Sequence, residues 1–206
     1  MSIVIPYQKV VEYLRKTFPL LRTSNELTNC PIELYDAWFK VVNQEDVATV
    51  VIRIANEFRR LGLRYEREIF DCEDFARLFT ELFNIYSKTN SCLSCGGRVD
   101  AYPIEDGKIS PIGLVLGYHG YNILIFCKSK NSKLMYPGVK VDDLDNLEVY
   151  VSLIEPQAVK YVNTDQDVND VFLDVVKLNN YYVFGYEVNL DGYKYLITYH
   201  TEKVMI

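Results

Sequence analysis

The spacing of the apolar residues changes near residue 90, and this change constrains the fold more than any other feature. Before it, apolar side chains recur every three to four residues, as on one face of an amphipathic helix. After it come short runs of β-branched and aromatic residues, which are typical of strands. Helices followed by strands predict an α+β fold, with N-terminal helices (about 1–90) packed on an antiparallel β-sheet (about 98–206).

The individual elements follow from the same patterns. We expect helices at residues 7–18, Ile32–Val42, Asn43–Leu61, Asp71–Tyr86 and Asp167–Leu178. We expect strands at Ile112–Leu116, Tyr121–Cys127, Leu147–Ile154 and Ala158–Val162, and a hairpin of Tyr181–Val188 and Tyr193–His200. The segment Ser91–Ser110 is expected to be mostly loop, because it contains several Gly, Cys and Pro residues.

Length and composition narrow the class of protein. A chain of 206 residues that is 49% hydrophobic fits one domain, 1–206. The net charge of -6 argues against nonspecific nucleic-acid binding, which needs basic residues to neutralise phosphates. Neither a signal peptide nor a membrane-spanning run is visible, and five cysteines is an odd number for a disulfide framework. We therefore expect a soluble, cytoplasmic protein. Its many tyrosines and few glutamines are also common in heat-adapted proteins.

One cysteine occupies the start of a predicted helix, in the segment Asp71-Cys72-Glu73-Asp74. Asp71 and Asp74 fit a capping box, which places Cys72 in the first turn. Unpaired backbone N–H groups and the helix dipole favour a thiolate there, whereas the neighbouring carboxylates oppose it. A cationic histidine would have to offset those carboxylates if Cys72 is a nucleophile. The alternative is a buried structural cysteine.

A histidine and a glutamate complete the candidate site. His119 lies between two glycines at the start of a strand, and Glu155 ends a later strand before Pro156. A histidine could act as base to the thiol, with the carboxylate orienting its ring. Asn122 and Gln157 follow these two residues and could assist. His200 is the other histidine of the chain, and a structural role remains the alternative for each residue.

These motifs resemble those of a known family. Asp71-Cys72-Glu73-Asp74-Phe75-Ala76, His119 with Asn122, and Glu155-Pro156-Gln157 are similar to the papain-like C-terminal domain of the fungal agglutinin from Marasmius oreades and to related bacterial and phage proteins. The resemblance covers about residues 68–157. It implies a papain-like fold and a thiol protease with a catalytic triad of Cys72, His119 and Glu155. It also implies a peptide or protein substrate and a dependence on calcium or manganese, for which Asp71, Glu73 and Asp74 could supply oxygen ligands.

The chain departs from this family in its details. Tyr118 stands where the family usually has glycine, Gly120 replaces alanine, and we expect no lectin domain. The expected function is cysteine-dependent hydrolysis of peptide or amide bonds. The alternatives are a transamidase or transglutaminase using the same triad, and a catalytically silent papain-like interaction domain, which could form a homo-oligomer.

Cys92 and Cys95 form half of a zinc-ribbon pattern. Cys30 and Cys127 could complete a four-thiol site only if the fold brings them together. A Cys92–Cys95 disulfide or two reduced thiols are the other interpretations. We expect no other cofactor.

Overall fold

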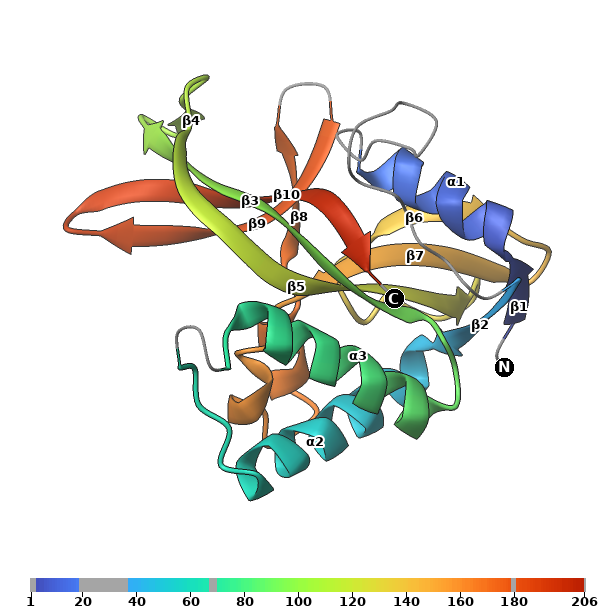
Figure 1. Cartoon of the computed structure of the whole chain (residues 1–206). Helices are drawn as coiled ribbons and strands as arrows, with labels where there is room; N and C mark the ends of the chain where they lie inside the picture. Colours follow the sequence, from blue (N-terminus) through green and yellow to red (C-terminus); the bar gives the residue numbers. More distant parts are fainter. Residues whose placement is uncertain (1–2, 19–36, 67–69, 179–180, 206) are drawn as a thin grey trace.

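A computed structural model describes residues 3–18, 37–66, 70–178 and 181–205 (Figure 1). Its strands are β1 (Ile3–Pro6), β2 (Trp38–Asn43), β3 (Cys92–Glu105), β4 (Lys108–Ile109), β5 (Leu114–Ser129), β6 (Val139–Asp143), β7 (Leu147–Ile154), β8 (Asp174–Leu178), β9 (Tyr181–Leu190) and β10 (Tyr193–Met205). Its helices are α1 (Tyr7–Thr17), α2 (Gln44–Arg60) and α3 (Cys72–Ser87), with short 3-10 helices η1 (Val159–Tyr161) and η2 (Asp167–Val171).

All ten strands belong to one sheet, whose main order is β1-β2-β5-β3-β10-β9-β8. The sheet is mixed, since β2 runs parallel to β5 whereas the other described pairs of strands are antiparallel. β7 pairs with β5 only from Asn122 onward. The earlier part of β5 therefore has β3 on one side and no strand on the other side among the described residues.

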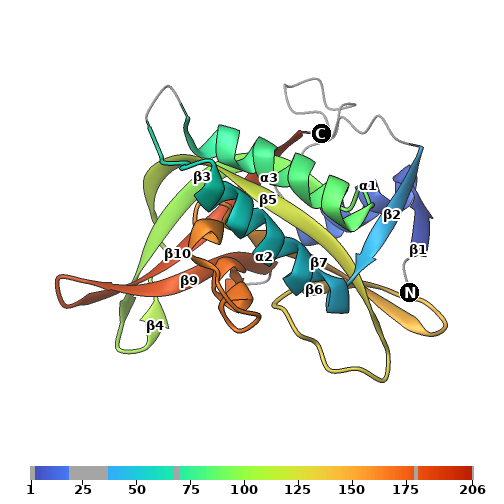
Figure 2. The same ribbon diagram turned by 90° about the horizontal axis from the view of Figure 1, so that it is seen from below.

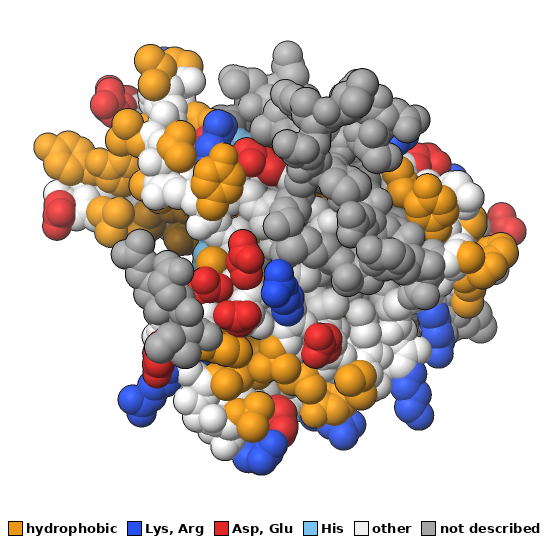
Figure 3. Space-filling view, in the orientation of Figure 1, with side chains coloured by type: hydrophobic (Ala, Val, Ile, Leu, Met, Phe, Trp, Pro, Cys, Tyr) orange, Lys and Arg blue, Asp and Glu red, His pale blue; other side chains and the backbone are white. Residues whose placement is uncertain are grey.

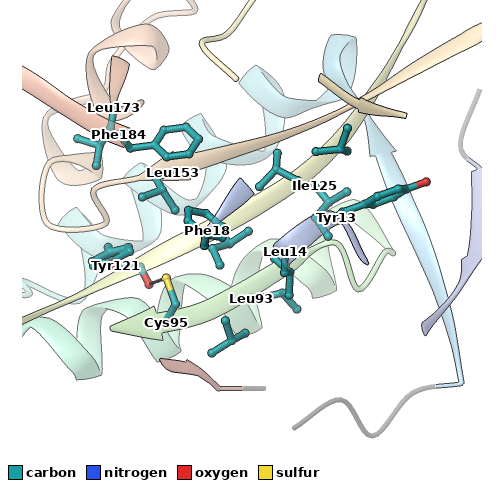
Figure 4. Close-up of a cluster of buried hydrophobic side chains, with 14 of the residues drawn as sticks. Tyr13, Leu14, Phe18, Leu93, Cys95, Tyr121, Ile125, Leu153, Leu173 and Phe184 are labelled. Atoms are coloured by element: carbon teal, nitrogen blue, oxygen red, sulfur yellow. Dashed lines mark hydrogen bonds between the residues drawn. The ribbon is translucent and has the colours of Figure 1, made fainter. Parts of the chain in front are cut away.

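The three helices cover both faces of the sheet. α2 and α3 pack on one face, where their apolar side chains meet Leu124 and Phe126 of β5. Figure 2, which views the molecule from below, shows these two helices side by side in front of the sheet. α1 lies on the opposite face, where Tyr13 and Leu14 meet Ile125 (Figures 1 and 4). Alternate side chains of β5 thus enter two separate cores, as expected for a strand covered on both faces.

The predicted fold class is wrong. The structure is mostly β, with ten strands and three α-helices among the described residues, and its sheet is mixed rather than antiparallel. Strands β1 and β2 lie within the half that was predicted to be helical. The helices also do not gather on one side of the sheet, as the papain-like α+β prediction required.

Several elements differ from prediction for identifiable reasons. Residues 38–42 of the predicted Ile32–Val42 helix form β2, and the rest of that helix, apart from residue 37, lies outside the described residues. The predicted loop is largely the central strand β3. Its glycines allow close backbone approach, since a Cβ on Gly97 would lie 1.9 Å from the carbonyl oxygen of His200. The predicted 158–162 strand contains η1, and the predicted 167–178 helix is η2 followed by β8.

Other elements agree with prediction. The helices α1, α2 and α3, the strand β7 and the C-terminal hairpin of β9 and β10 are confirmed. No helix among the described residues combines the length and apolar character needed to cross a membrane.

Candidate functional site

Cys72 is the first residue of α3, and the predicted capping box holds this end of the helix. The Asp71 carboxylate accepts a hydrogen bond from the Glu73 backbone N–H group at 3.0 Å. The Asp74 carboxylate accepts one from the Asp71 N–H group at 3.2 Å. The half-buried Cys72 thiol is therefore fixed at the positive end of the α3 dipole.

A glycine lets β5 approach this end of α3. A Cβ on Gly120 would lie 2.9 Å from both the carbonyl carbon and the carbonyl oxygen of Cys72. Real Cβ atoms do not approach backbone so closely, so only glycine fits without a shift of the helix or the strand. The backbone N–H group of Gly120 also donates a hydrogen bond to the Cys72 sulfur. The glycine beside His119 thus permits a close approach between the backbones of β5 and α3.

Cys72, His119 and Glu155 form a continuous hydrogen-bonded chain. His119 Nε2 lies 2.7 Å from Glu155 Oε2, and the His119 ring also hydrogen-bonds to the Cys72 thiol. Because Glu155 occupies Nε2, the other ring nitrogen, Nδ1, is the one that remains for the thiol. The three residues that the sequence singled out thus lie together, although they belong to α3, β5 and the end of β7.

The contacts favour an ion pair between the thiol and the imidazole. The pKa of Cys72 is lowered, chiefly by the hydrogen bond to His119 and further by the Gly120 N–H group, while burial and Asp71 act in the opposite direction. Burial is the largest influence on His119 and lowers its pKa, but the hydrogen bonds to Cys72 and Glu155 outweigh it and raise the pKa to about 10. Near neutral pH these shifts favour a thiolate beside an imidazolium.

Other groups hold Glu155 in place. Its Oε1 accepts a hydrogen bond from the backbone N–H group of Gln157 at 3.1 Å. Its Oε2 accepts a longer one, at 3.4 Å, from the hydroxyl of Tyr199 on β10. Burial raises the pKa of Tyr199 and so does the nearby Glu155 charge, so this hydroxyl stays neutral and donates. Gln157 therefore supports the carboxylate through its backbone.

Tyr199 is a site residue that the sequence interpretation missed. Its ring meets the His119 ring edge-on, with 6.0 Å between the ring centroids. In the sequence it is one of several tyrosines in the segment of the predicted C-terminal hairpin. No local signal separates it from the others, because β10 reaches β5 only through β3.

Asn122 has its hydrogen bonds elsewhere than at His119. It is fully buried, and its amide NH₂ group donates to the Ala76 carbonyl and to Thr80 Oγ1, both at 2.8 Å. Asn122 thus ties β5 to the second turn of α3. Its contacts indicate a structural role in holding α3 against the sheet.

Replacement of Asn122 by alanine tests this role. We expect the free energy of unfolding in urea to fall by about 1–3 kcal/mol, because two buried hydrogen bonds are lost. Asn56→Ala on the exposed side of α2 is the matched control and should change it by less than about 0.5 kcal/mol. Equal unfolding midpoints for the Asn122 variant and the wild type would contradict the assignment.

A cavity of about 560 Å³ adjoins the triad. His119 and Glu155 line it, together with Gln157 and the tyrosines Tyr161, Tyr186 and Tyr199. Its lining also carries Lys160, Asp170, Asp174 and the apolar residues Ala158, Phe172 and Leu173. The cavity is large enough for a small-molecule ligand, and it offers both ring faces and polar groups.

The structure does not bring together the predicted zinc ligands. Cys92 lies in the core beneath α2 and α3, whereas Cys95 lies in the opposite core, where its thiol donates to the Tyr121 carbonyl (Figure 4). They project from opposite faces of β3, so they can neither share one zinc ion nor form a disulfide with each other. Cys92, Cys95 and Cys127 are buried, and Cys30 lies outside the described residues. Within those residues no group of three or more His, Cys, Asp or Glu side chains could hold a metal ion.

Comparison with known proteins gives little support for any family. No family model matches the chain, and no curated protein matches it. Among solved structures that match are the "PSL1a-E64 complex" and the Polyporus squamosus lectin bound to a human-type influenza-binding epitope. Both have 17% sequence identity and a TM-score of 0.38, and both matches cover 75% of this chain. The chain spans less than half of their length, 44% and 43% respectively.

These findings correct the prediction drawn from the papain-like resemblance. Neither a family model nor a curated protein supports that family. The predicted family, its thiol-protease function and the peptide substrate that came with it are therefore not retained. The same holds for the alternatives of a transamidase and a silent papain-like domain, and for the calcium or manganese dependence.

Proposed function

We propose that the protein carries a reactive-thiol site that binds a small electrophilic ligand covalently through Cys72. The observation that carries this proposal is the hydrogen-bonded chain from Cys72 through His119 to Glu155, of which His119 and Glu155 line a cavity. A nucleophilic thiol needs a lowered pKa, a cationic partner and access for its ligand. Cys72 is half-buried, whereas the other three described cysteines are buried.

The bond-forming step uses only groups of this site and a ligand carbonyl. The Cys72 thiolate donates its electron pair to the carbonyl carbon, and a C–S bond forms. The π electrons of the C=O bond move to the oxygen, and the His119 imidazolium supplies the proton that this oxygen takes up. The product is a thiohemiacetal, and the reverse steps release the ligand. Glu155 orients the ring and stabilises its charged form.

The cavity lining supports a polar ligand that carries hydroxyl groups. Tyrosine rings offer flat surfaces for contact, while Gln157, Asp170 and Asp174 offer hydrogen-bonding groups. A hydroxylated aldehyde meets both requirements of the site. The reduced thiols of Cys72, Cys92 and Cys95 also support a reducing, cytoplasmic setting. Exclusion of nucleic acids stays a prediction from the net charge of -6.

Competition for Cys72 tests the proposal. With Cys30 replaced by serine, iodoacetamide should add a single group, which maps to Cys72 and is absent after Cys72→Ala. Glyceraldehyde should slow this alkylation, and reactivity should return after dilution. Glycerol has the hydroxyl groups but lacks the carbonyl, so it should give no protection. Alkylation of Cys72 that glyceraldehyde leaves unchanged would rule out covalent capture of a carbonyl ligand.

A further inference from the structure

A second, smaller pocket adjoins the cavity of the candidate site. It has a volume of about 240 Å³ and is lined by residues of β3, β5, β9 and β10. Three residues line both the small pocket and the larger cavity, namely His119, Tyr186 and Tyr199. Cys72 lines neither space, but its thiol hydrogen-bonds to the His119 ring. A ligand bonded to Cys72 therefore needs to extend only past this ring to enter the small pocket.

The small pocket has an apolar lining, unlike the cavity beside it. Two buried aliphatic side chains of neighbouring strands, Val99 and Ile197, contribute to it, and so does Leu116. No Lys, Arg, Asp or Glu side chain of the described residues lines the small pocket, whereas four such side chains line the larger cavity. A charged group would lose its hydration in the small pocket without gaining a charged partner. The lining therefore favours an uncharged, apolar group.

An irregularity in β5 lies at the small pocket. Val99 pairs with Gly117 and Asp100 pairs with Val115, so Leu116 has no residue opposite it on β3. A β-bulge of this kind bends the strand and re-aims a side chain, and such bulges are common next to active sites. Gly117 has a φ of 151°, a conformation that residues with a Cβ rarely adopt. Leu116 and Gly117 both line the pocket, although consecutive residues of a regular strand face opposite sides.

Exposed apolar side chains belong to the lining of the small pocket as well. Figure 3 shows apolar side chains gathered on the arm that β5 forms with β3, β9 and β10. Two lining residues of this arm, Leu116 and Tyr186, are 59% and 41% exposed. A ligand group in the pocket would remove part of this apolar surface from water, and this burial is favourable.

We propose that the small pocket binds an uncharged apolar group, about the size of a phenyl ring, of the carbonyl ligand that Cys72 captures. This inference rests on the proposed function, because the bond to Cys72 holds the ligand beside His119. An apolar cavity of about 150 Å³ can hold a benzene molecule, so a pocket of about 240 Å³ is sufficient for a phenyl group. The rings of Tyr186 and Tyr199 offer aromatic contacts to such a group. The larger cavity stays available for polar groups of the same ligand.

Protection of Cys72 by two matched aldehydes tests the apolar pocket. The aldehydes are 3-phenylpropanal and propanal, which differ only in the phenyl ring. In the Cys30→Ser protein, 3-phenylpropanal should slow the alkylation of Cys72 by iodoacetamide at concentrations about tenfold or more below those that propanal requires. Burial of a phenyl ring strengthens binding by about this factor or more.

Two substitutions on β5 locate the phenyl ring. Leu116→Glu should abolish the preference for 3-phenylpropanal, because it places a charge in the lining of the small pocket. Val115→Glu is the matched control, since Val115 is also 59% exposed, directly precedes Leu116 and is not among the residues that line the pocket. This control should keep the preference. Circular dichroism of both variants controls for folding.

The outcomes separate the apolar pocket from the reactive thiol. Equal protection by the two aldehydes, or a preference that Leu116→Glu leaves intact, would overturn the apolar pocket but not the capture of a carbonyl by Cys72. If neither aldehyde protects Cys72, the proposed function fails, and 3-phenylpropan-1-ol, which lacks the carbonyl, tests the pocket alone. Its ring protons should give saturation-transfer NMR signals with the Cys30→Ser protein that Leu116→Glu removes and Val115→Glu keeps. Absence of these signals, or their persistence in Leu116→Glu, would overturn the pocket as a binding site.

Discussion

Replacing His119 by alanine should slow the alkylation of Cys72 by iodoacetamide about 30-fold or more at about pH 6. The His119 hydrogen bond is the main cause of the lowered Cys72 pKa. Without it, burial and Asp71 still raise the pKa, so the thiol returns to at least its ordinary value of about 8.5. At about pH 6 less than about 1% of such a thiol is ionised.

The effect of the His119 substitution on the alkylation rate should depend on pH. Alkylation of the wild type should level off at a lower pH than alkylation of the His119→Ala protein, because a thiol with a lowered pKa ionises at a lower pH. Alkylation of the His119→Ala protein should rise about tenfold per pH unit until its own pKa is reached. The low-pKa thiolate is intrinsically the weaker nucleophile, so the two rates should approach each other at high pH.

Tyr118→Ala is the matched control for the His119 variant. Tyr118 precedes His119 on β5, is 74% exposed and makes no contact with the triad that the structure records among its described residues. Its replacement should leave the rate of alkylation nearly unchanged. Equal rates for the wild type and His119→Ala at about pH 6 would show that the imidazole does not activate the thiol.

Replacing Gly120 by alanine should reduce the reactivity of Cys72 about tenfold, a loss that a displacement of well under 1 Å can cause at a preorganised site. The new Cβ would lie 2.9 Å from the Cys72 carbonyl carbon and oxygen. The start of α3 or the strand must therefore move, and either movement disturbs the hydrogen bonds of the thiol to Gly120 and His119. The measurement is again the rate of alkylation at about pH 6.

Gly138→Ala is the control for the Gly120 variant. Its Cβ would lie 3.3 Å from the carbonyl oxygen of Val151, a tight contact away from Cys72. The Gly138→Ala substitution should alter the free energy of unfolding slightly and leave the rate of Cys72 alkylation unchanged. If Gly120→Ala alkylates as fast as the wild type while remaining folded, the close approach of β5 to α3 does not set the geometry of the thiol.

Local sequence signals predicted the parts of the site that are themselves local. The Asp71 and Asp74 capping box fixes the start of α3 within one turn, and the structure has it as expected. The proximity of Cys72, His119 and Glu155 also follows the prediction, although they are far apart in the chain. That prediction used the identity and order of the residues, and their catalytic role remains a proposal.

The sequence predictions were wrong where the structure of a segment depends on pairing with strands that are distant in the chain. The glycines of β3 resemble loop residues in the sequence, yet Gly97 is glycine because the backbone of β10 lies against it. Tyr199 contacts Glu155 only because β10 lies beside β3. The prediction of the fold class was wrong for the same reason. β1 and β2 become strands by pairing with each other and with β5, and no local pattern in the sequence reveals this pairing.

The pKa of the Cys72 thiol tests the central claim most directly. It can be measured from the ultraviolet absorbance of the thiolate as a function of pH, as the difference between the Cys30→Ser protein and the same protein with Cys72→Ala. We predict a transition clearly below the ordinary thiol value of about 8.5 in the wild-type site, and its return to that value or above in His119→Ala. A wild-type transition at or above about 8.5 would contradict a reactive-thiol site.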